Sequence, residues 1–191
     1  MKRLFASIAV SLSLVSFAFA QADGINILPK PYSLEPRPGS FSFGPKTKIF
    51  VSGKVNRQSA AVLNALLLAR YGFSLEVTSK LPTENYIAFS SIGGGLIDWQ
   101  RNPPVHEGSY SLEIDQQSIL LMGVRYSEIG KYYAIQSLMQ LLPARFDGKA
   151  DIPAVRINDR PRFKYRGMHL DVSRHFMPVE FVKKYIDQMA Q

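Results

Sequence analysis

The sequence contains no cysteine among its 191 residues. Disulfide bonds, thiolate metal sites and a cysteine nucleophile are therefore excluded for this chain, whichever compartment it occupies. Histidine is also scarce, and the sequence has three: His106, His169 and His175. Their spacing from acidic residues does not match that of metal ligands. We therefore predict no metal site, and the sequence implies no organic cofactor.

Acidic residues are fewer than basic ones, with 15 against 23, which gives a formal net charge of +8. The basic residues form no run of the kind that binds nucleic acid. A mildly basic, solvated surface is the simpler interpretation, and we expect no nucleic-acid partner. The apolar content is ample for a packed core, since 46% of the residues are hydrophobic and 12% are aromatic.

Residues 1–20 have the pattern of a secretory signal peptide. Lys2 and Arg3 precede an apolar run over residues 4–19, and Ala18-Phe19-Ala20 supplies a small-x-small cleavage site. An uncleaved anchor is the alternative, but the run is shorter than the ~20 residues that span a bilayer. The pattern predicts a secreted or periplasmic product with no stable membrane anchor after cleavage.

Strands are expected at residues 48–52, 73–78 and 86–90. Residues 108–115 and 118–122 alternate polar and apolar side chains on either side of Gln116-Gln117, which predicts a β-hairpin. Residues 151–158 form a short strand or an extended linker. Residues 25–44 contain four prolines, which favour extended or turning backbone over a helix.

Two helices are predicted between these strands. The first is capped by Asn56 and ends near Gly72, with a leucine-rich face that we assign to the core. The second is capped by Ser127 and ends at Pro143, and its apolar spacing predicts that it lies across a sheet. Its two adjacent tyrosines, Tyr132 and Tyr133, are interpreted as structural.

The C-terminal part of the chain predicts one β/α unit. Residues 165–172 are rich in apolar residues, as in a strand covered on both faces, and Arg174 and His175 follow at its C-terminal end. Pro178 suits the first turn of a helix whose apolar residues recur at helical spacing: Val179, Val182, Ile186 and Met189.

These residues carry a resemblance to glycoside hydrolase family 20. Pro161-Arg162-Phe163, Tyr165-Arg166-Gly167 and the Leu170-Asp171-x-x-Arg174-His175-Phe176 stretch resemble the start of that family's catalytic barrel. Residues 28–31, residues 39–43 and the hairpin followed by residues 130–142 resemble the accessory domain before the barrel. Members are β-N-acetylhexosaminidases, so the resemblance implies N-acetylhexosamine-containing glycans or chitooligosaccharides as substrates.

The resemblance implies a fold class and a domain division. We expect a signal peptide at 1–20 and an α+β accessory domain at 21–160, mainly an antiparallel sheet with packed helices. Residues 161–191 would begin a TIM (β/α)8 barrel. A barrel of about 250 residues needs ~30 for each unit. The 191 − 160 = 31 residues after Arg160 therefore supply one unit, and we expect the barrel to be truncated.

Within that barrel, the resemblance gives Arg174 the role of binding the non-reducing sugar through its ring hydroxyls. A salt bridge to Asp171, three residues earlier, is the alternative. Asp171 and His175 are weaker candidates for chemistry, Asp171 as a group that orients its neighbours. We assign no catalytic residue, because family members use an adjacent Asp-Glu pair and this sequence has no adjacent acidic pair.

The family's reaction is retaining and substrate-assisted. The substrate's acetamido oxygen attacks the anomeric carbon, the glutamic acid protonates the leaving oxygen and the aspartate orients the acetamido group. Without this pair the chain is expected to be inactive alone. The alternative function is a secreted non-catalytic carbohydrate-binding or interaction module.

Overall fold

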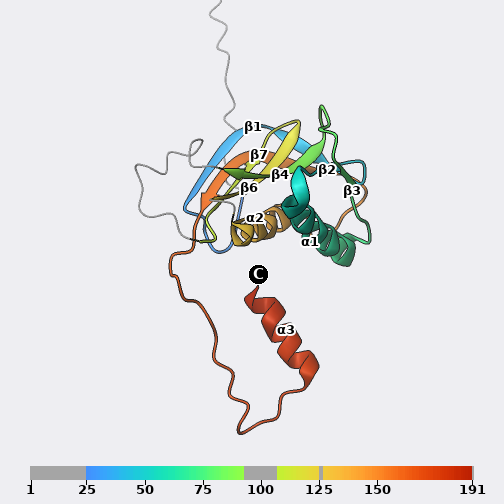
Figure 1. Cartoon of the computed structure of the whole chain (residues 1–191). Coiled ribbons are helices and arrows are strands. Elements are labelled where there is room, and N and C mark those ends of the chain that lie inside the picture. Colours follow the sequence, from blue (N-terminus) through green and yellow to red (C-terminus); the bar gives the residue numbers. More distant parts are fainter. Residues whose placement is uncertain (1–24, 93–106, 125–126, 191) are drawn as a thin grey trace, which may run out of the picture.

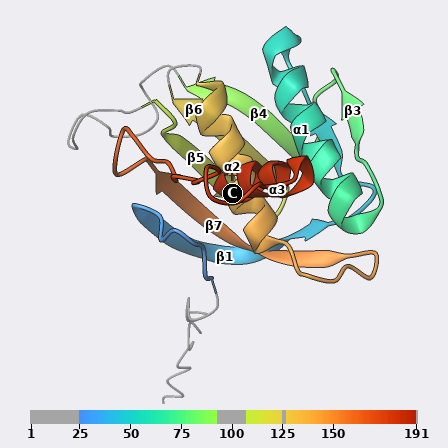
Figure 2. The ribbon, with the colours of Figure 1, turned by 90° about the horizontal axis from the view of Figure 1, so that it is seen from below.

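A computed structural model describes residues 25–92, 107–124 and 127–190. The expected signal peptide at 1–20 and His106 lie outside these residues. In the described part, seven strands form one sheet in the order β1-β7-β5-β6-β4-β2-β3. Helices α1 (Gly53–Tyr71) and α2 (Glu128–Leu141) pack on one face of it, and α3 (Val179–Met189) lies beyond them (Figures 1 and 2).

One half of the sheet is antiparallel. Strand β1 (Ser33–Phe43) pairs with β7 (Ala150–Asp159), β7 pairs with β5 (Tyr110–Ile114), and β5 pairs with β6 (Ser118–Val124). The hairpin predicted around Gln116-Gln117 is therefore confirmed. Pro36 and Pro38 lie in β1, at the edge of the sheet, where a residue without an N–H is tolerated. The segment at 151–158 is a full strand rather than a linker.

The other half of the sheet is parallel. Strand β4 (Tyr86–Ile92) pairs with β6 on one side and with β2 (Lys48–Phe50) on the other, and β2 pairs with β3 (Glu76–Thr78). The α+β class is thus confirmed, but the antiparallel arrangement holds for four of the seven strands and the whole sheet is mixed. Helices α1 and α2 form the layer that covers its apolar face.

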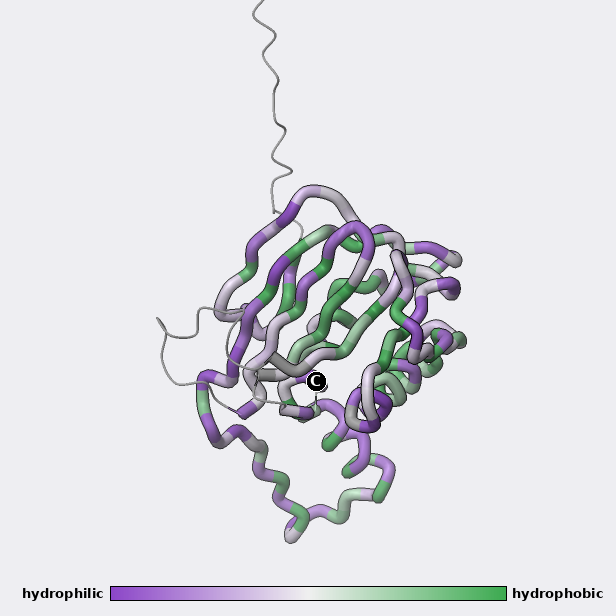
Figure 3. The backbone as a smooth tube through the Cα atoms, turned by 45° about the horizontal axis from the view of Figure 1, so that its top comes forward, coloured by the Kyte–Doolittle hydropathy of each residue, from purple (hydrophilic) through white to green (hydrophobic). Residues whose placement is uncertain are grey.

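The core lies between that layer and the sheet. Leu63 and Leu67 of α1 and Leu138 of α2 are fully buried, as are Ile87, Leu112, Ile119 and other central strand residues. Figure 3 shows the hydrophobic residues concentrated in these strands and helices. The leucine-rich face of α1 is core, as predicted, and the helix ends at Gly72, whose φ of +77° suits a residue without a Cβ.

The predicted cap of α1 is wrong. The helix begins at Gly53 after Ser52, so Asn56 lies inside it. The Asn56 side chain instead donates hydrogen bonds to the carbonyl oxygens of Ser52 and Phe89, and its oxygen accepts from Lys131 Nζ at 2.9 Å. Lys131 is fully buried and also pairs with Glu128 at 2.7 Å. Asn56 therefore links α1, β4 and α2 by hydrogen bonds and does not cap the start of a helix.

The predicted cap of α2 is confirmed. Ser127 Oγ accepts a hydrogen bond from Gly130 N at 3.1 Å, and the helix ends at Leu141, two residues before Pro143. Gly123 of β6 and Gly130 of α2 meet there, because a Cβ built on Gly130 would lie 3.3 Å from Gly123 Cα. Two glycines thus bring the start of α2 onto the sheet. Within the described residues, no helix is both long and apolar enough to cross a bilayer.

Candidate substrate-binding segment

Residues 161–178, called here segment 161–178, connect the sheet to α3. The strand predicted at 165–172 is not formed, and this stretch has no regular secondary structure. The physical reason is that a parallel strand obtains its hydrogen bonds from neighbouring strands, and no described segment pairs with 165–172. The helix predicted after Pro178 is confirmed as α3.

This part of the chain exposes large apolar side chains. Tyr165 and Phe176 are 91% and 83% exposed, and no residue of α3 is buried. Exposed side chains also include Phe163, Met168, Val172, Val179, Phe181, Ile186 and Met189. Figure 1 shows segment 161–178 leaving the accessory domain and α3 turning back toward it, with the C-terminal end of α3 near α2. Exposed apolar surface of this extent is typical of a site that packs against another part of a protein.

Arg174 lies in the middle of this exposed segment. Its Nε is 3.5 Å from Asp171 Oδ2, so the ion pair considered as an alternative is present. The Arg174 side chain is 91% exposed, however, and an ion pair in water contributes little to stability. The two Nη atoms have no partner among the described residues. The guanidinium therefore keeps most of its donors available for a ligand.

The other residues considered for chemistry remain apart. Asp171 Oδ1 accepts a hydrogen bond from Ser173 N at 2.9 Å, which stabilises the turn before Arg174. His169 and His175 are both exposed. Among residues 25–92, 107–124 and 127–190, no three His, Asp or Glu side chains gather into a group that could hold a metal ion.

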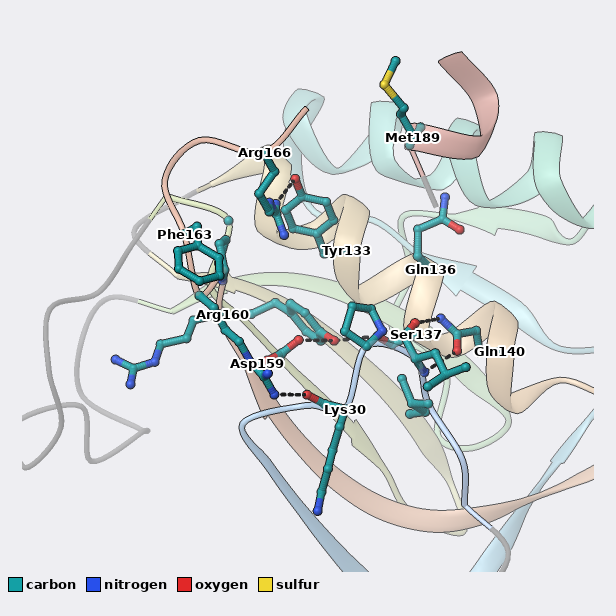
Figure 4. A pocket seen from close by; sticks show the side chains of 18 residues that line it. Lys30, Tyr133, Gln136, Ser137, Gln140, Asp159, Arg160, Phe163, Arg166 and Met189 are labelled. Carbon is teal, nitrogen blue, oxygen red and sulfur yellow. Dashed lines mark hydrogen bonds between the residues drawn. The ribbon is translucent and has the colours of Figure 1, made fainter. Parts of the chain in front are cut away.

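A cavity of about 460 Å³ lies where segment 161–178 leaves the sheet (Figure 4). Its polar floor comes from β5, β7 and α2. Asp159 Oδ1 accepts a hydrogen bond from Tyr32 N at 3.0 Å, and Tyr110 shares a short hydrogen bond with Ser137. Burial raises the pKa of the Asp159 carboxyl, although backbone N–H groups of Arg160 and Tyr32 oppose that shift.

One side of the cavity is formed by Tyr133 of α2 and Arg166 of segment 161–178. Arg166 Nη2 donates a hydrogen bond to Tyr133 Oη at 2.8 Å. In the sequence, Arg166 belongs to the barrel motif and Tyr133 to a helix that predicts a structural role, so no motif joins the two residues. The contact spans 33 residues, and no local pattern of spacing reports it.

Two comparisons with family profiles cover almost all the described chain. Residues 24–160 match "Glycosyl hydrolase family 20, domain 2", and residues 163–191 match "Glycosyl hydrolase family 20, catalytic domain". The chain belongs to glycoside hydrolase family 20. This family 20 chain therefore combines an accessory domain of the family with residues of its catalytic domain, as the sequence motifs indicated.

Curated relatives agree with this assignment. The chain is 36% identical over 174 residues to a beta-hexosaminidase of Porphyromonas gingivalis, covering 87% of this chain and 21% of the relative. It is 33% identical over 166 residues to a beta-hexosaminidase of Vibrio furnissii, covering 87% of this chain and 24% of that protein. The family 20 chain thus spans about a quarter or less of the length of these two relatives.

Solved structures of the family share the fold. An exo β-N-acetylglucosaminidase of Vibrio harveyi, in complex with N-acetylglucosamine, aligns with a TM-score of 0.69 and 30% identity, covering 85% of this chain and 23% of that one. A mutant β-hexosaminidase of Streptomyces plicatus, in complex with its product GlcNAc, aligns with a TM-score of 0.69 and 29% identity, covering 85% and 31%.

Proposed function

We propose that this chain is the N-terminal portion of a β-N-acetylhexosaminidase. The enzyme would hydrolyse terminal non-reducing N-acetylglucosamine or N-acetylgalactosamine residues of glycans or chitooligosaccharides by the substrate-assisted retaining route. The observation that carries the proposal is the match of residues 163–191 to the family's catalytic domain, because it includes the Asp-x-x-Arg-His-Phe motif at 171–176.

Arg174 is the residue proposed to bind the sugar. Its planar guanidinium presents five donors, an array well suited to adjacent sugar hydroxyls. Its exposure and its single weak contact with Asp171 leave it free to turn toward a ligand. In a complete barrel the C-terminal ends of the strands face the substrate, and Arg174 follows the stretch predicted as the first strand.

The proposed reaction needs an acid that these residues do not supply. The sequence has no adjacent Asp-Glu or Glu-Glu pair. The carboxylates of the described part are distributed over separate elements, with Glu113 paired to Arg156 at 2.6 Å and Glu128 paired to Lys131 at 2.7 Å. We therefore propose that the 191 residues alone are inactive, and that the acid lies in further barrel units.

Hydrolysis of a chromogenic N-acetyl-β-glucosaminide tests this proposal. The purified chain is compared with a version extended through whatever coding sequence follows Gln191. We expect turnover in the extended protein and none above background in the 191-residue chain. Turnover by the short chain would show that the catalytic acid lies within these 191 residues. Asp171 and His175 would then be the first residues to replace in the search for it. An extended protein with further barrel strands and an Asp-Glu pair, yet without turnover, would refute the hexosaminidase proposal.

We also propose that the protein is exported to the periplasm or the medium. The proposal is supported by the basic start, apolar run and small-x-small site within residues 1–20. Expression in a bacterial host followed by mass spectrometry of the exported fraction should give a product beginning at Gln21. A product that keeps Lys2 and Arg3 and stays with the cytoplasmic fraction would contradict export.

A further inference from the structure

The contact between Arg166 and Tyr133 joins the catalytic-domain residues to the accessory domain. Arg166 donates to Tyr133 Oη at 2.8 Å, and its Cζ lies 5.3 Å from the centroid of the same ring. The guanidinium therefore binds the hydroxyl and lies near the same aromatic ring. The hydrogen bond is charge-assisted, and the nearby ring adds an attraction for the cation, so the contact favours one position of the guanidinium.

Tyr133 provides the rigid side of this contact. Its ring packs against the main core and lies so close to Gly108 that a Cβ there would be 2.9 Å from Tyr133 Cε2. The helix that carries it is fixed to the sheet by Ala134, Ile135 and Leu138, which are buried. The hydroxyl acceptor therefore has a defined place relative to the sheet.

Arg166, in contrast, belongs to a segment without a strand partner. Segment 161–178 makes a second hydrogen bond to earlier residues, from Arg162 Nη2 to the carbonyl oxygen of Lys30. Its length is 3.5 Å, the limit for such a bond. Further along, Tyr185 Oη of α3 donates to the carbonyl oxygen of His169 at 3.4 Å. Among the described residues, Arg166 is thus the strongest polar attachment of the segment to the accessory domain.

We infer that Arg166 and Tyr133 are a positioning pair that sets where the segment carrying Arg174 begins, and thereby the register in which Arg174 meets the sugar. In the barrel proposed above, residues 165–172 would form the first strand, and a strand that shifts by one residue turns every side chain to its other face. An anchor at Arg166, eight residues before Arg174, opposes such a shift. The catalytic part of this inference rests on the function proposed above.

Trypsin provides a direct test on the 191-residue chain, because cleavage after Arg166 requires its side chain to leave Tyr133. The comparison is between Tyr133→Phe, which removes the hydroxyl and keeps the ring, and Tyr132→Phe as the matched control. Tyr132 is the neighbouring residue of α2, and its ring centroid lies 6.0 Å from that of Tyr133. Its hydroxyl makes no hydrogen bond to another described residue. Cleavage after the exposed Arg174 is the internal reference.

We expect the ratio of cleavage after Arg166 to cleavage after Arg174 to rise about two- to tenfold in Tyr133→Phe, the effect of losing one hydrogen bond. The ratio should stay unchanged in Tyr132→Phe. An unchanged ratio in Tyr133→Phe, or an equal rise in both variants, would contradict the inference that the Tyr133 hydroxyl holds Arg166.

Kinetics of the extended protein test the positioning role. We expect Tyr133→Phe to raise KM several-fold with little change in kcat or Tm, and Tyr132→Phe to match the wild type. Arg166→Lys, which keeps a cation near the ring, should retain more activity than Arg166→Ala. Wild-type KM in Tyr133→Phe, or a fall in activity that follows a lowered Tm, would overturn the positioning role. If the extended wild type has no turnover, the proposed function fails. The ratio of trypsin cleavages still tests whether Tyr133 holds Arg166.

Discussion

Replacing Gly130 with alanine is expected to destabilise the accessory domain by about 1 to 2 kcal/mol net. A Cβ on Gly130 would lie well inside van der Waals contact with the carbonyl oxygen of Ser109. Both Ser109 and Gly123, the next neighbour, oppose the new methyl group with backbone atoms rather than with a flexible side chain. Relief therefore requires the start of α2 to move away from β5 and β6.

Helix propensity acts in the opposite direction, which makes the sign of the result informative. Alanine is better than glycine inside a helix by about 1 kcal/mol, so propensity alone predicts that Gly130→Ala stabilises the protein. Overpacking costs typically 1 to 3 kcal/mol and more where backbone must move, and we expect it to prevail here.

Urea unfolding followed by far-UV circular dichroism measures this effect. Gly167→Ala is the matched control, because a Cβ on Gly167 would have only an ordinary contact, 3.7 Å from Tyr165 Oη. We expect the control to stay within about 0.5 kcal/mol of the wild type. A Gly130→Ala protein as stable as the control would show that α2 does not approach the sheet as closely as described.

Replacing Arg174 with alanine in the extended protein is expected to lower kcat/KM by about 10² to 10⁴. Two charged hydrogen bonds to sugar hydroxyls contribute about 1.5 to 3 kcal/mol each, and each 1.4 kcal/mol corresponds to tenfold. Arg174→Lys should recover little of the loss, because an ammonium group cannot present the planar fork of donors that two adjacent hydroxyls accept.

Stability separates this role from a structural one. The Arg174 side chain is 91% exposed, so its removal should leave the urea midpoint unchanged. Lys183→Ala is a suitable control, since Lys183 is an exposed cation of α3 that pairs with Glu180 at 3.0 Å, as Arg174 pairs with Asp171. We expect that variant to keep wild-type kcat/KM. An Arg174→Ala enzyme with wild-type kcat/KM would refute substrate binding by this residue.

The elements that the sequence predicted correctly are those with local signals. Ser127 before an apolar periodic stretch located α2, Gly72 located the end of α1, and alternation around Gln116-Gln117 located the β5-β6 hairpin. Each signal lies within a few residues of the feature that it predicts. The family motif at 161–176 likewise consists of neighbouring residues.

The features that the sequence did not predict depend on distant partners. Asn56 has the chemistry of a helix cap, but its role is fixed by Lys131, 75 residues away. Residues 165–172 have strand composition, yet a strand needs a neighbouring strand for its hydrogen bonds, and no described segment pairs with them. The hydrogen bond from Arg166 to Tyr133 also joins residues far apart in the sequence. The same holds for the strand pairs in the parallel half of the sheet.

The pairing of β1 with β7 also determines the order in which this domain can be completed during synthesis. β1 is the first strand made and lies at the edge of the sheet, with β7 as its neighbour. The ribosome must therefore add more than a hundred residues after β1 before its partner strand exists. Tyr133 has been synthesised by then, and Arg166 emerges seven residues after β7 ends at Asp159. The accessory domain can thus close just as the first catalytic-domain residues appear, and it presents them with a finished surface on which to begin folding.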